Sequence, residues 1–138
     1  MPDLIELEVA TPERLMVREK VSEVQVPGQD GYLGILPGHA PLLGLLGTGL
    51  LSYRVGPNRR YLAVQGGFLE VQPEHLRVLA NVAERAEEID VQRAKDDLKK
   101  AEADAVNPSI GIDPAAAWAV ILHQQARVEA AEKNSTPG

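Results

Sequence analysis

The sequence predicts an α+β protein in which a strand-rich N-terminal part is followed by two helices. All three tyrosines, the single phenylalanine and all but two of the 12 glycines precede residue 86, whereas the later residues are rich in Ala, Glu, Lys and Gln. Apolar residues alternate with a period of two in the first part and recur every three or four residues in the second. A length of 138 residues suits one ordinary domain, or one small domain with an appendage.

Short strands separated by turns predict a sandwich or a barrel for the first part. Ile5, Leu7 and Val9 alternate with glutamates, which is typical of a strand with one buried face. Glycine and proline mark the turns, and two of these turns join pairs of strands into hairpins. The expected hairpins pair 50–55 with 61–65 and 68–71 with 76–79.

Two helices joined by a short connector are expected after residue 86. The first ends at Asn107, because Pro108 disfavours a helical backbone at the preceding residue. Asp113 followed by Pro114 has the arrangement of an N-cap before a proline at the first helical position. The apolar stripes consist of Val91, Ala94, Leu98, Ala101 and Ala105, and of Ala117, Ile121 and Val128. Since such Ala-rich stripes bury little area, we expect an antiparallel hairpin that docks weakly and adjustably.

The chain lacks the motifs of catalytic and metal sites. It has no cysteine, no P-loop and no nucleophile elbow, and its three histidines lie far apart. We therefore expect no catalytic residue, no metal site and no required cofactor. The formal net charge of -6 argues against binding to nucleic acid. No apolar run reaches the roughly 20 residues of a membrane helix, so contact with a membrane is expected only through a partner.

Two stretches stand out, and each has two interpretations. Residues 31–43 concentrate glycine and proline, which suits either a folded turn between strands or a rigid exposed loop that contacts a partner. In residues 84–94, Asp90 and Arg93 are three positions apart and would share a helix face. That spacing suits an N-cap with a salt-linked arginine, or a polar site in which Arg93 contacts a phosphate. Composition and spacing alone favour the structural interpretation of both stretches.

Three motifs resemble those of F-type ATP synthase ε subunits. Residues 31–42 read GYLGILPGHAPL, similar to the family's G-x-L-G-I-x-P-G-H-x-P-L segment. Residues 64–71 read VQGGFLEV, similar to its S-G-G-F-L-E-V strand pair, with Gln65 in place of the usual serine. Residues 89–94 read IDVQRA and are similar to the I/L-D-x-x-R-A motif of bacterial members. The resemblance runs in order from about Ile5 to about Glu132.

The resemblance implies a ten-stranded β-sandwich over residues 1–86 and a regulatory antiparallel helical hairpin over residues 87–138. It implies a non-catalytic subunit of the proton-translocating ATP synthase, peripheral to the cell membrane on its cytoplasmic side. The sandwich would bind the γ subunit and the ring of c subunits, and the helices would reach the α and β subunits of the catalytic head and inhibit ATP hydrolysis. An ATP-sensing module and a β-sandwich adaptor outside the synthase stay open as alternatives.

The resemblance also implies contact residues in the first part of the chain. Tyr32, Pro37, Gly38 and His39 would form the interface with the c ring and the γ subunit. Members of the family often have an acidic residue where this chain has Tyr32. An aromatic contact would then replace a charged one, because tyrosine suits half-buried interfaces.

A nucleotide site is implied by three further positions. Glu84, Asp90 and Arg93 match residues of the ATP-binding members. Those members also carry arginines on the second helix, where this chain has Ile121 and Gln125. Because lost guanidinium contacts weaken the binding of a triphosphate, we expect ATP to be a weak regulatory ligand or none.

Overall fold

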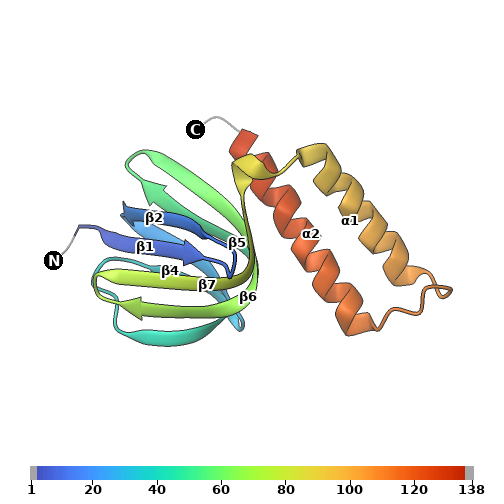
Figure 1. Ribbon diagram of the computed structural model, residues 1–138, viewed down its shortest axis with the longest axis horizontal. Coiled ribbons are helices and arrows are strands. Elements are labelled where there is room, and N and C mark those ends of the chain that lie inside the picture. Colours follow the sequence, from blue (N-terminus) through green and yellow to red (C-terminus); the bar gives the residue numbers. More distant parts are fainter. Residues whose placement is uncertain (1–2, 136–138) are drawn as a thin grey trace.

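The computed structural model describes residues 3–135, which form a seven-stranded β-sheet followed by two helices (Figure 1). The strands are β1 (Ile5–Ala10), β2 (Leu15–Val21), β3 (Glu23–Gly28), β4 (Gly31–Ile35), β5 (Leu42–Val55), β6 (Asn58–Gln72) and β7 (His75–Arg85). A short 3-10 helix, η1 (Ala86–Glu88), leads to α1 (Val91–Val106) and α2 (Pro114–Ser135). Of the expected ranges 1–86 and 87–138, residues 1–2 and 136–138 lie outside the described residues.

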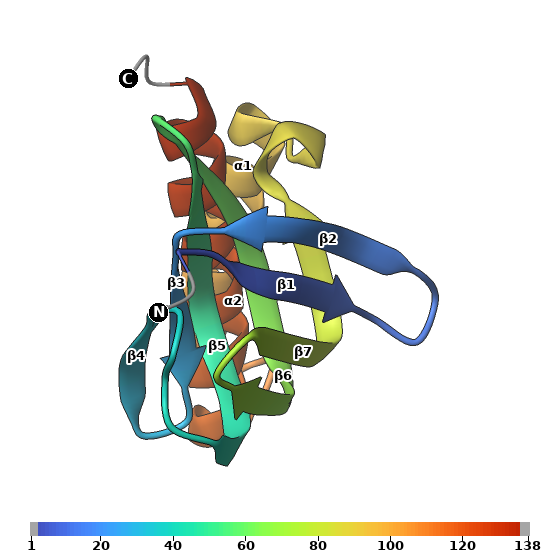
Figure 2. The ribbon, with the colours of Figure 1, turned by 90° about the vertical axis from the view of Figure 1, so that its left-hand side faces the viewer.

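The sheet folds over a core of large aliphatic side chains. Its strand order is β2-β1-β7-β6-β5-β3-β4, and β1 and β7 are its parallel pair. Figure 2 shows β1 and β2 crossing in front of β5 and β6, so the sheet forms two layers. Ile5, Leu7 and Val9 are fully buried, as the alternation in the sequence predicted. The expected β-sandwich followed by two helices is therefore confirmed.

The strand count differs from the ten strands that the resemblance implied. β5, β6 and β7 contain 14, 15 and 11 residues, and the segments 61–65 and 68–71, expected as separate strands, are both part of β6. The register does not change between these segments, because Gln65 pairs with Val82 and Gly67 pairs with Ala80. Pairing that resumes in the same register makes one long strand where shorter strands were expected.

A row of three residues marks the place where these long strands bend. Gly47, Gly66 and Asn81 occupy opposite positions on β5, β6 and β7, and the pairing of the strands is interrupted there. Gly66 has a φ of 63° and Gly67 a φ of 124°, which residues with a Cβ atom rarely adopt. The core side chains of β6 are even-numbered before this row and odd-numbered after it, namely Leu62 and Val64, then Leu69 and Val71. At the bend row, the strand face that pointed into the core turns outward, and the opposite face turns inward.

The helices cover only one side of the bend row. α2 lies between α1 and the sheet (Figure 1) and packs on β5 and β6. The buried residues of this contact are mostly alanines, namely Leu50, Ala63, Ala86, Ile89, Ala94, Ala126, Ala130 and Ala131. Small side chains bury little apolar area each, so this second core is weaker than the core of the sandwich.

Both helices begin at the residues that the sequence predicted. Asp90 Oδ1 accepts a hydrogen bond of 2.9 Å from the backbone N–H of Arg93. Asp113 Oδ2 accepts hydrogen bonds from the N–H groups of Ala115 and Ala116, at 3.1 and 3.2 Å. These contacts satisfy N–H groups that have no partner within the first turn of a helix.

The bend row can be tested by adding a methyl group to Gly67. A Cβ atom there would collide with the carbonyl oxygen of Leu79, and the backbone has a positive φ. We expect Gly67→Ala to lower the free energy of unfolding by about 3 kcal/mol, from backbone strain and overpacking together. Urea denaturation measures this change. Gly34→Ala is the matched control, because no atom lies within 4 Å of its added Cβ; a similar loss in both variants would contradict the assigned role of the bend.

Candidate functional site

An exposed row of apolar side chains crosses five strands on the half of the sheet that α2 leaves uncovered. Leu45 is opposite Phe68, Phe68 is opposite Leu79, Leu79 is opposite Ala10, and Ala10 is opposite Leu15. The exposed fractions are 48% for Leu45, 57% for Phe68, 48% for Leu79 and 50% for Leu15. Opposite Cβ atoms on paired strands lie about 5 Å apart, so these five residues form one continuous band, the apolar row. Such a band on a rigid sheet is typical of a contact surface.

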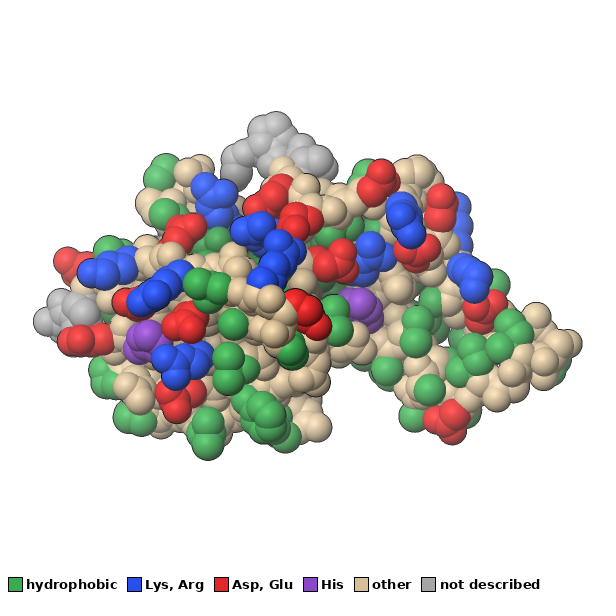
Figure 3. All heavy atoms as spheres, viewed as in Figure 1, with side chains coloured by type: hydrophobic (Ala, Val, Ile, Leu, Met, Phe, Trp, Pro, Cys, Tyr) green, Lys and Arg blue, Asp and Glu red, His purple; other side chains and the backbone are tan. Residues whose placement is uncertain are grey.

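Charged side chains lie beside the apolar row on the same face of the sheet. Glu70, Arg77, Glu8 and Arg18 are opposite one another on β6, β7, β1 and β2, two residues along each of the first three strands from the row. Figure 3 shows this pattern as charged side chains over the middle of the sandwich and hydrophobic ones along its lower edge. The face therefore combines an apolar band with a polar margin, as protein interfaces do.

The loop between β4 and β5 carries three of the residues expected at an interface. The N–H of Gly38 donates to the carbonyl oxygen of Pro73 at 2.7 Å, which ties this loop to the turn between β6 and β7. His39 is held locally, since its N–H donates to the carbonyl oxygen of Leu36 and its Nδ1 lies 2.7 Å from that of Ala40. Pro37 and His39 are half-buried, and Gly38 is exposed. The segment is thus a folded turn that also presents an exposed surface.

Tyr32 lies elsewhere, beside the helices. Its hydroxyl accepts a hydrogen bond of 3.0 Å from the N–H of Leu50, on the half of β5 that α2 covers. A Cβ atom at Gly49 would lie 2.5 Å from that hydroxyl, so the ring needs a glycine there. Tyr32 and Tyr61 line a cavity of about 450 Å³ together with Lys133 of α2. The structure therefore does not bring Tyr32 together with the turn of residues 37–39.

Arg127 joins three elements at the contact between the helices and the sheet. Its Nε lies 2.8 Å from Glu84 Oε1 on β7, and its Nη1 lies 3.1 Å from Asp97 Oδ2 on α1. Nη1 also donates to Gln124 Oε1 at 2.8 Å. Its side chain is only 14% exposed, so these charge-assisted hydrogen bonds are largely shielded from water. Arg127 was not among the expected site residues, although it is the only arginine of the second helix.

The three residues expected to bind ATP are engaged in different contacts. Glu84 pairs with Arg127, the Asp90 carboxylate caps α1, and the side chain of Arg93 is exposed. The contact between Asp90 and Arg93 is made by the backbone N–H of Arg93 and not by its guanidinium group. In this arrangement Glu84 and Asp90 make contacts that fix the helices, and no hydrogen bond or ion pair among the described residues joins the side chains of the three.

Known proteins resemble this chain over nearly its whole length. Residues 4–86 match the family model for the ATP synthase, Delta/Epsilon chain, beta-sandwich domain. The ATP synthase epsilon chain of Solibacter usitatus is 62% identical over 133 residues, which are 96% of this chain and 99% of that protein. The chain belongs to the ATP synthase epsilon-chain family. The epsilon chains of Koribacter versatilis and Syntrophobacter fumaroxidans are 49% and 41% identical, over 74% and 96% of this chain and 72% and 99% of theirs.

Solved structures share the fold of this epsilon-family chain. A chain in the Euglena gracilis mitochondrial ATP synthase structure aligns with a TM-score of 0.80 at 22% identity, over 96% of this chain and 83% of that one. A chain in the Tetrahymena thermophila structure aligns with a TM-score of 0.53 at 17% identity, over 96% of both chains. Family membership confirms the expected non-catalytic subunit. In residues 3–135, no helix is long and apolar enough to cross a membrane.

His123 adds a titratable group to the contact between the helices and the sheet. Its Nε2 is buried and has no hydrogen-bond partner among the described residues. Burial lowers the pKa of His123 below its usual value, the charge of Arg127 lowers it further, and the carboxylate of Glu84 raises it. The neutral imidazole is therefore the form that the docked α2 accommodates.

The shifted pKa of His123 predicts that docking weakens in acid. Released or unfolded chains take up the proton near the ordinary pKa of about 6.5, whereas the docked form takes it up only at lower pH. The contribution of neutral His123 to the docking of α2 is therefore complete above the ordinary pKa of about 6.5. It is lost as the pH falls from there through the lowered pKa of the docked form. Hydrogen exchange in α2, corrected for intrinsic rates at pH 7.5 and 5.5, should show lower protection at pH 5.5. His123→Gln should reduce this difference and His39→Gln should keep it; equal behaviour of the two variants would refute the assignment.

Proposed function

We propose that the sandwich binds the γ subunit and the c ring of an F-type ATP synthase through its uncovered face, and so forms part of the rotating central stalk. The observation that carries this proposal is the apolar row, which is exposed on the half of the sheet that α2 does not cover. Its side chains come from separate strands that are hydrogen-bonded together, so the surface is rigid before a partner arrives. A preorganised surface loses little conformational entropy on binding.

The turn of residues 37–39 is the proposed contact with the c ring. It comes just before the start of β5, the end of that strand that also carries Leu45 of the apolar row. The neighbouring Leu36 and Leu43 are 58% and 74% exposed. The hydrogen bond from Gly38 to Pro73 fixes the turn relative to β6 and β7. A fixed turn beside the apolar row would let the γ subunit and the ring be held at the same time. Tyr32 contributes to the helix contact in this proposal.

The two helices act in the proposal as an antiparallel hairpin, residues 87–138, that regulates ATP hydrolysis. The hairpin would leave the sheet and extend toward the α and β subunits of the catalytic head. An Ala-rich contact and the ion pairs of Arg127 support this, because both can be broken without exposing the core of the sandwich. The exposed Val106 and Trp118, at 82% and 58%, give the helices apolar surface for a second partner.

This role places the chain at the cell membrane as a peripheral component on the cytoplasmic side. The apolar row is a narrow band with charged neighbours, which suits a protein partner better than lipid. The chain would therefore reach the membrane only through the other subunits of the complex. No cofactor is required for the proposed role, and the formal net charge of -6 fits a protein partner rather than nucleic acid.

ATP binding is proposed to be weak or absent. Glu84 is already paired with Arg127, the Asp90 carboxylate caps α1, and Ile121 and Gln125 supply no guanidinium group. Arg93 is the one arginine of the expected trio, and a single arginine makes few of the contacts that a triphosphate needs. Isothermal calorimetry of the full chain with Mg-ATP should give a Kd above about 100 µM, weaker than about 5.5 kcal/mol. Micromolar affinity would overturn this part of the proposal.

The stalk contact is tested by placing a charge in the apolar row. Phe68→Asp should weaken capture of this chain by an immobilised γ subunit by about thirtyfold or more, since a charge at the centre of an interface removes a large contact and must be desolvated. Phe68 is 57% exposed, so the sandwich should keep its melting temperature. Val106→Asp is the control, because it adds the same charge at an exposed apolar site on α1. Unchanged capture of the Phe68 variant would contradict the proposed contact.

A further inference from the structure

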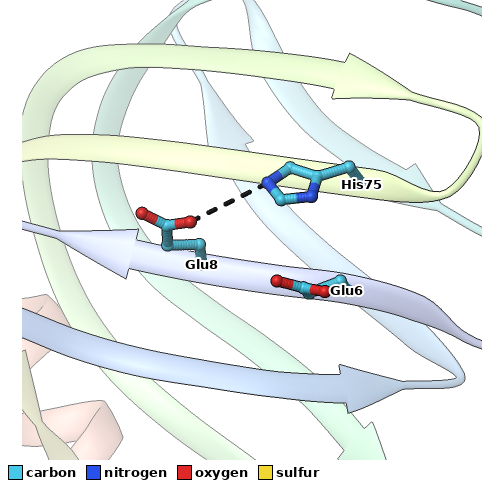
Figure 4. A group of neighbouring side chains, drawn as sticks. All are labelled: Glu6, Glu8 and His75. Carbon is cyan, nitrogen blue, oxygen red and sulfur yellow. Dashed lines mark ion pairs between the residues drawn. The ribbon is translucent and has the colours of Figure 1, made fainter.

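Three side chains with metal-binding groups meet on the outer face of β1 and β7. Glu6 and His75 are opposite one another in the parallel pair, and Glu8 follows Glu6 on the same face of β1. One ligand atom of each lies within 4.8 Å of the others. Figure 4 shows the imidazole of His75 pointing along β7 toward the carboxylate of Glu8, with Glu6 beside them. The two strands are fixed by their backbone pairing, so the three groups are held together by rigid elements.

His75 has an unexplained buried nitrogen at this place. Its Nε2 is buried and makes no hydrogen bond among the described residues, although the whole side chain is 30% exposed. The nearest carboxylate oxygen, Glu8 Oε2, is 3.8 Å away, which is too far for a hydrogen bond. A buried polar atom without a partner is costly. Neither the apolar row nor the helix contact uses this nitrogen.

The carboxylates also retain unused lone pairs. Arg18 Nε lies 3.5 Å from Glu6 Oε1, and Arg77 Nε lies 3.8 Å from Glu8 Oε2. Neither contact satisfies hydrogen-bond geometry in the described part of the chain, so each arginine screens a carboxylate without occupying it. Such loose surface pairs contribute little. A divalent cation would compete with Arg77 for the same oxygen of Glu8.

We propose that Glu6, Glu8 and His75 form a binding site for a divalent transition-metal ion of the zinc class. One imidazole nitrogen and two carboxylate oxygens are ligands that Zn²⁺ accepts, and water from the solvent-facing side completes a tetrahedral shell. Metal–ligand bonds are about 2.0–2.2 Å long, so these side chains would draw together from their present spacing, in which the ligand atoms lie within 4.8 Å of one another. Ca²⁺ and Mg²⁺ prefer oxygen ligands alone, so the nitrogen of His75 selects against them.

This site has a structural consequence at the N-terminal strand. β1 is held to β7 by a single parallel pairing, and both Glu6 and Glu8 belong to β1. A bound ion joins the two strands through side chains as well as through the backbone. Because the unfolded chain does not hold the three groups together, the ion stabilises the folded form. The expectation of no metal site rested on spacing along the sequence, and these ligands are brought together only by the fold.

The experiment is a titration of the full-length chain with ZnCl₂ at pH 7.5, followed by calorimetry and by the melting temperature, with MgCl₂ as the comparison ion. One Zn²⁺ per chain should bind with a Kd on the order of micromolar and raise the melting temperature. His75→Gln should weaken binding tenfold or more, and Glu8→Gln should weaken it as well. Arg77→Gln should strengthen it by up to about fivefold, because the competing cation is gone.

Two matched variants locate the ion. His39→Gln and His123→Gln remove the other histidines of the chain and should leave Zn²⁺ binding unchanged. No saturable binding, equal binding by the His75→Gln variant, or equal affinity for Mg²⁺ would each overturn the proposal. The test uses the chain alone, so it is independent of the capture by a γ subunit.

Discussion

The bend row of Gly47, Gly66 and Asn81 is the constraint on which the rest of the structure depends. At this row three hydrogen-bonded strands exchange their buried and outer faces without losing register. One side of the row presents the small residues on which α2 packs, and the other presents the apolar row to solvent. A side chain on Gly66 or Gly67 would oppose the positive φ angles that this exchange requires. The division of the sheet into a covered half and a free half thus follows from the backbone conformation.

The two apolar clusters differ in a way that suits different tasks. The sandwich core consists mostly of large side chains and draws on all seven strands, and removing any one of these large side chains leaves a cavity that costs a few kcal/mol. The helix contact consists mostly of alanines, together with the ion pairs that Arg127 makes with Glu84 and Asp97. Charge-assisted hydrogen bonds have strict geometry and exchange readily with water once the helix moves. They can therefore fix the docked position of α2 without making release of the helix as costly as unfolding the sandwich.

The sequence was sufficient for some of the elements and insufficient for the strand count and for most of the contacts between elements. The alternation of Ile5, Leu7 and Val9 and the Asp113–Pro114 pair report local backbone preferences, so the first strand and the start of α2 could be predicted. The ten strands that the resemblance implied were wrong, and Gly66 and Gly67 separate two expected strands although pairing resumes in the same register after Gly66. The Glu84–Arg127 pair joins residues that are 43 positions apart, and no local pattern reports such a separation. Turn chemistry predicted the Pro37–Gly38 segment, whereas the location of Tyr32 depended on the pairing of β4 with β3, which lies between β4 and β5 in the sheet.

Tyr32 shows how the same strand can contribute to both halves of the molecule. β4 ends at Ile35, just before the turn beside the apolar row, yet the hydroxyl of Tyr32 reaches Leu50 on the half that α2 covers. The absence of a side chain on Gly49 makes room for it. An acidic side chain at position 32 is shorter than tyrosine and would place a carboxylate, in place of the ring, beside the cavity that Lys133 also lines. The tyrosine offers a neutral hydroxyl and ring surface instead, beside the contact between α2 and the sheet. The apolar row on the uncovered half of the sheet is then the same whichever residue occupies position 32.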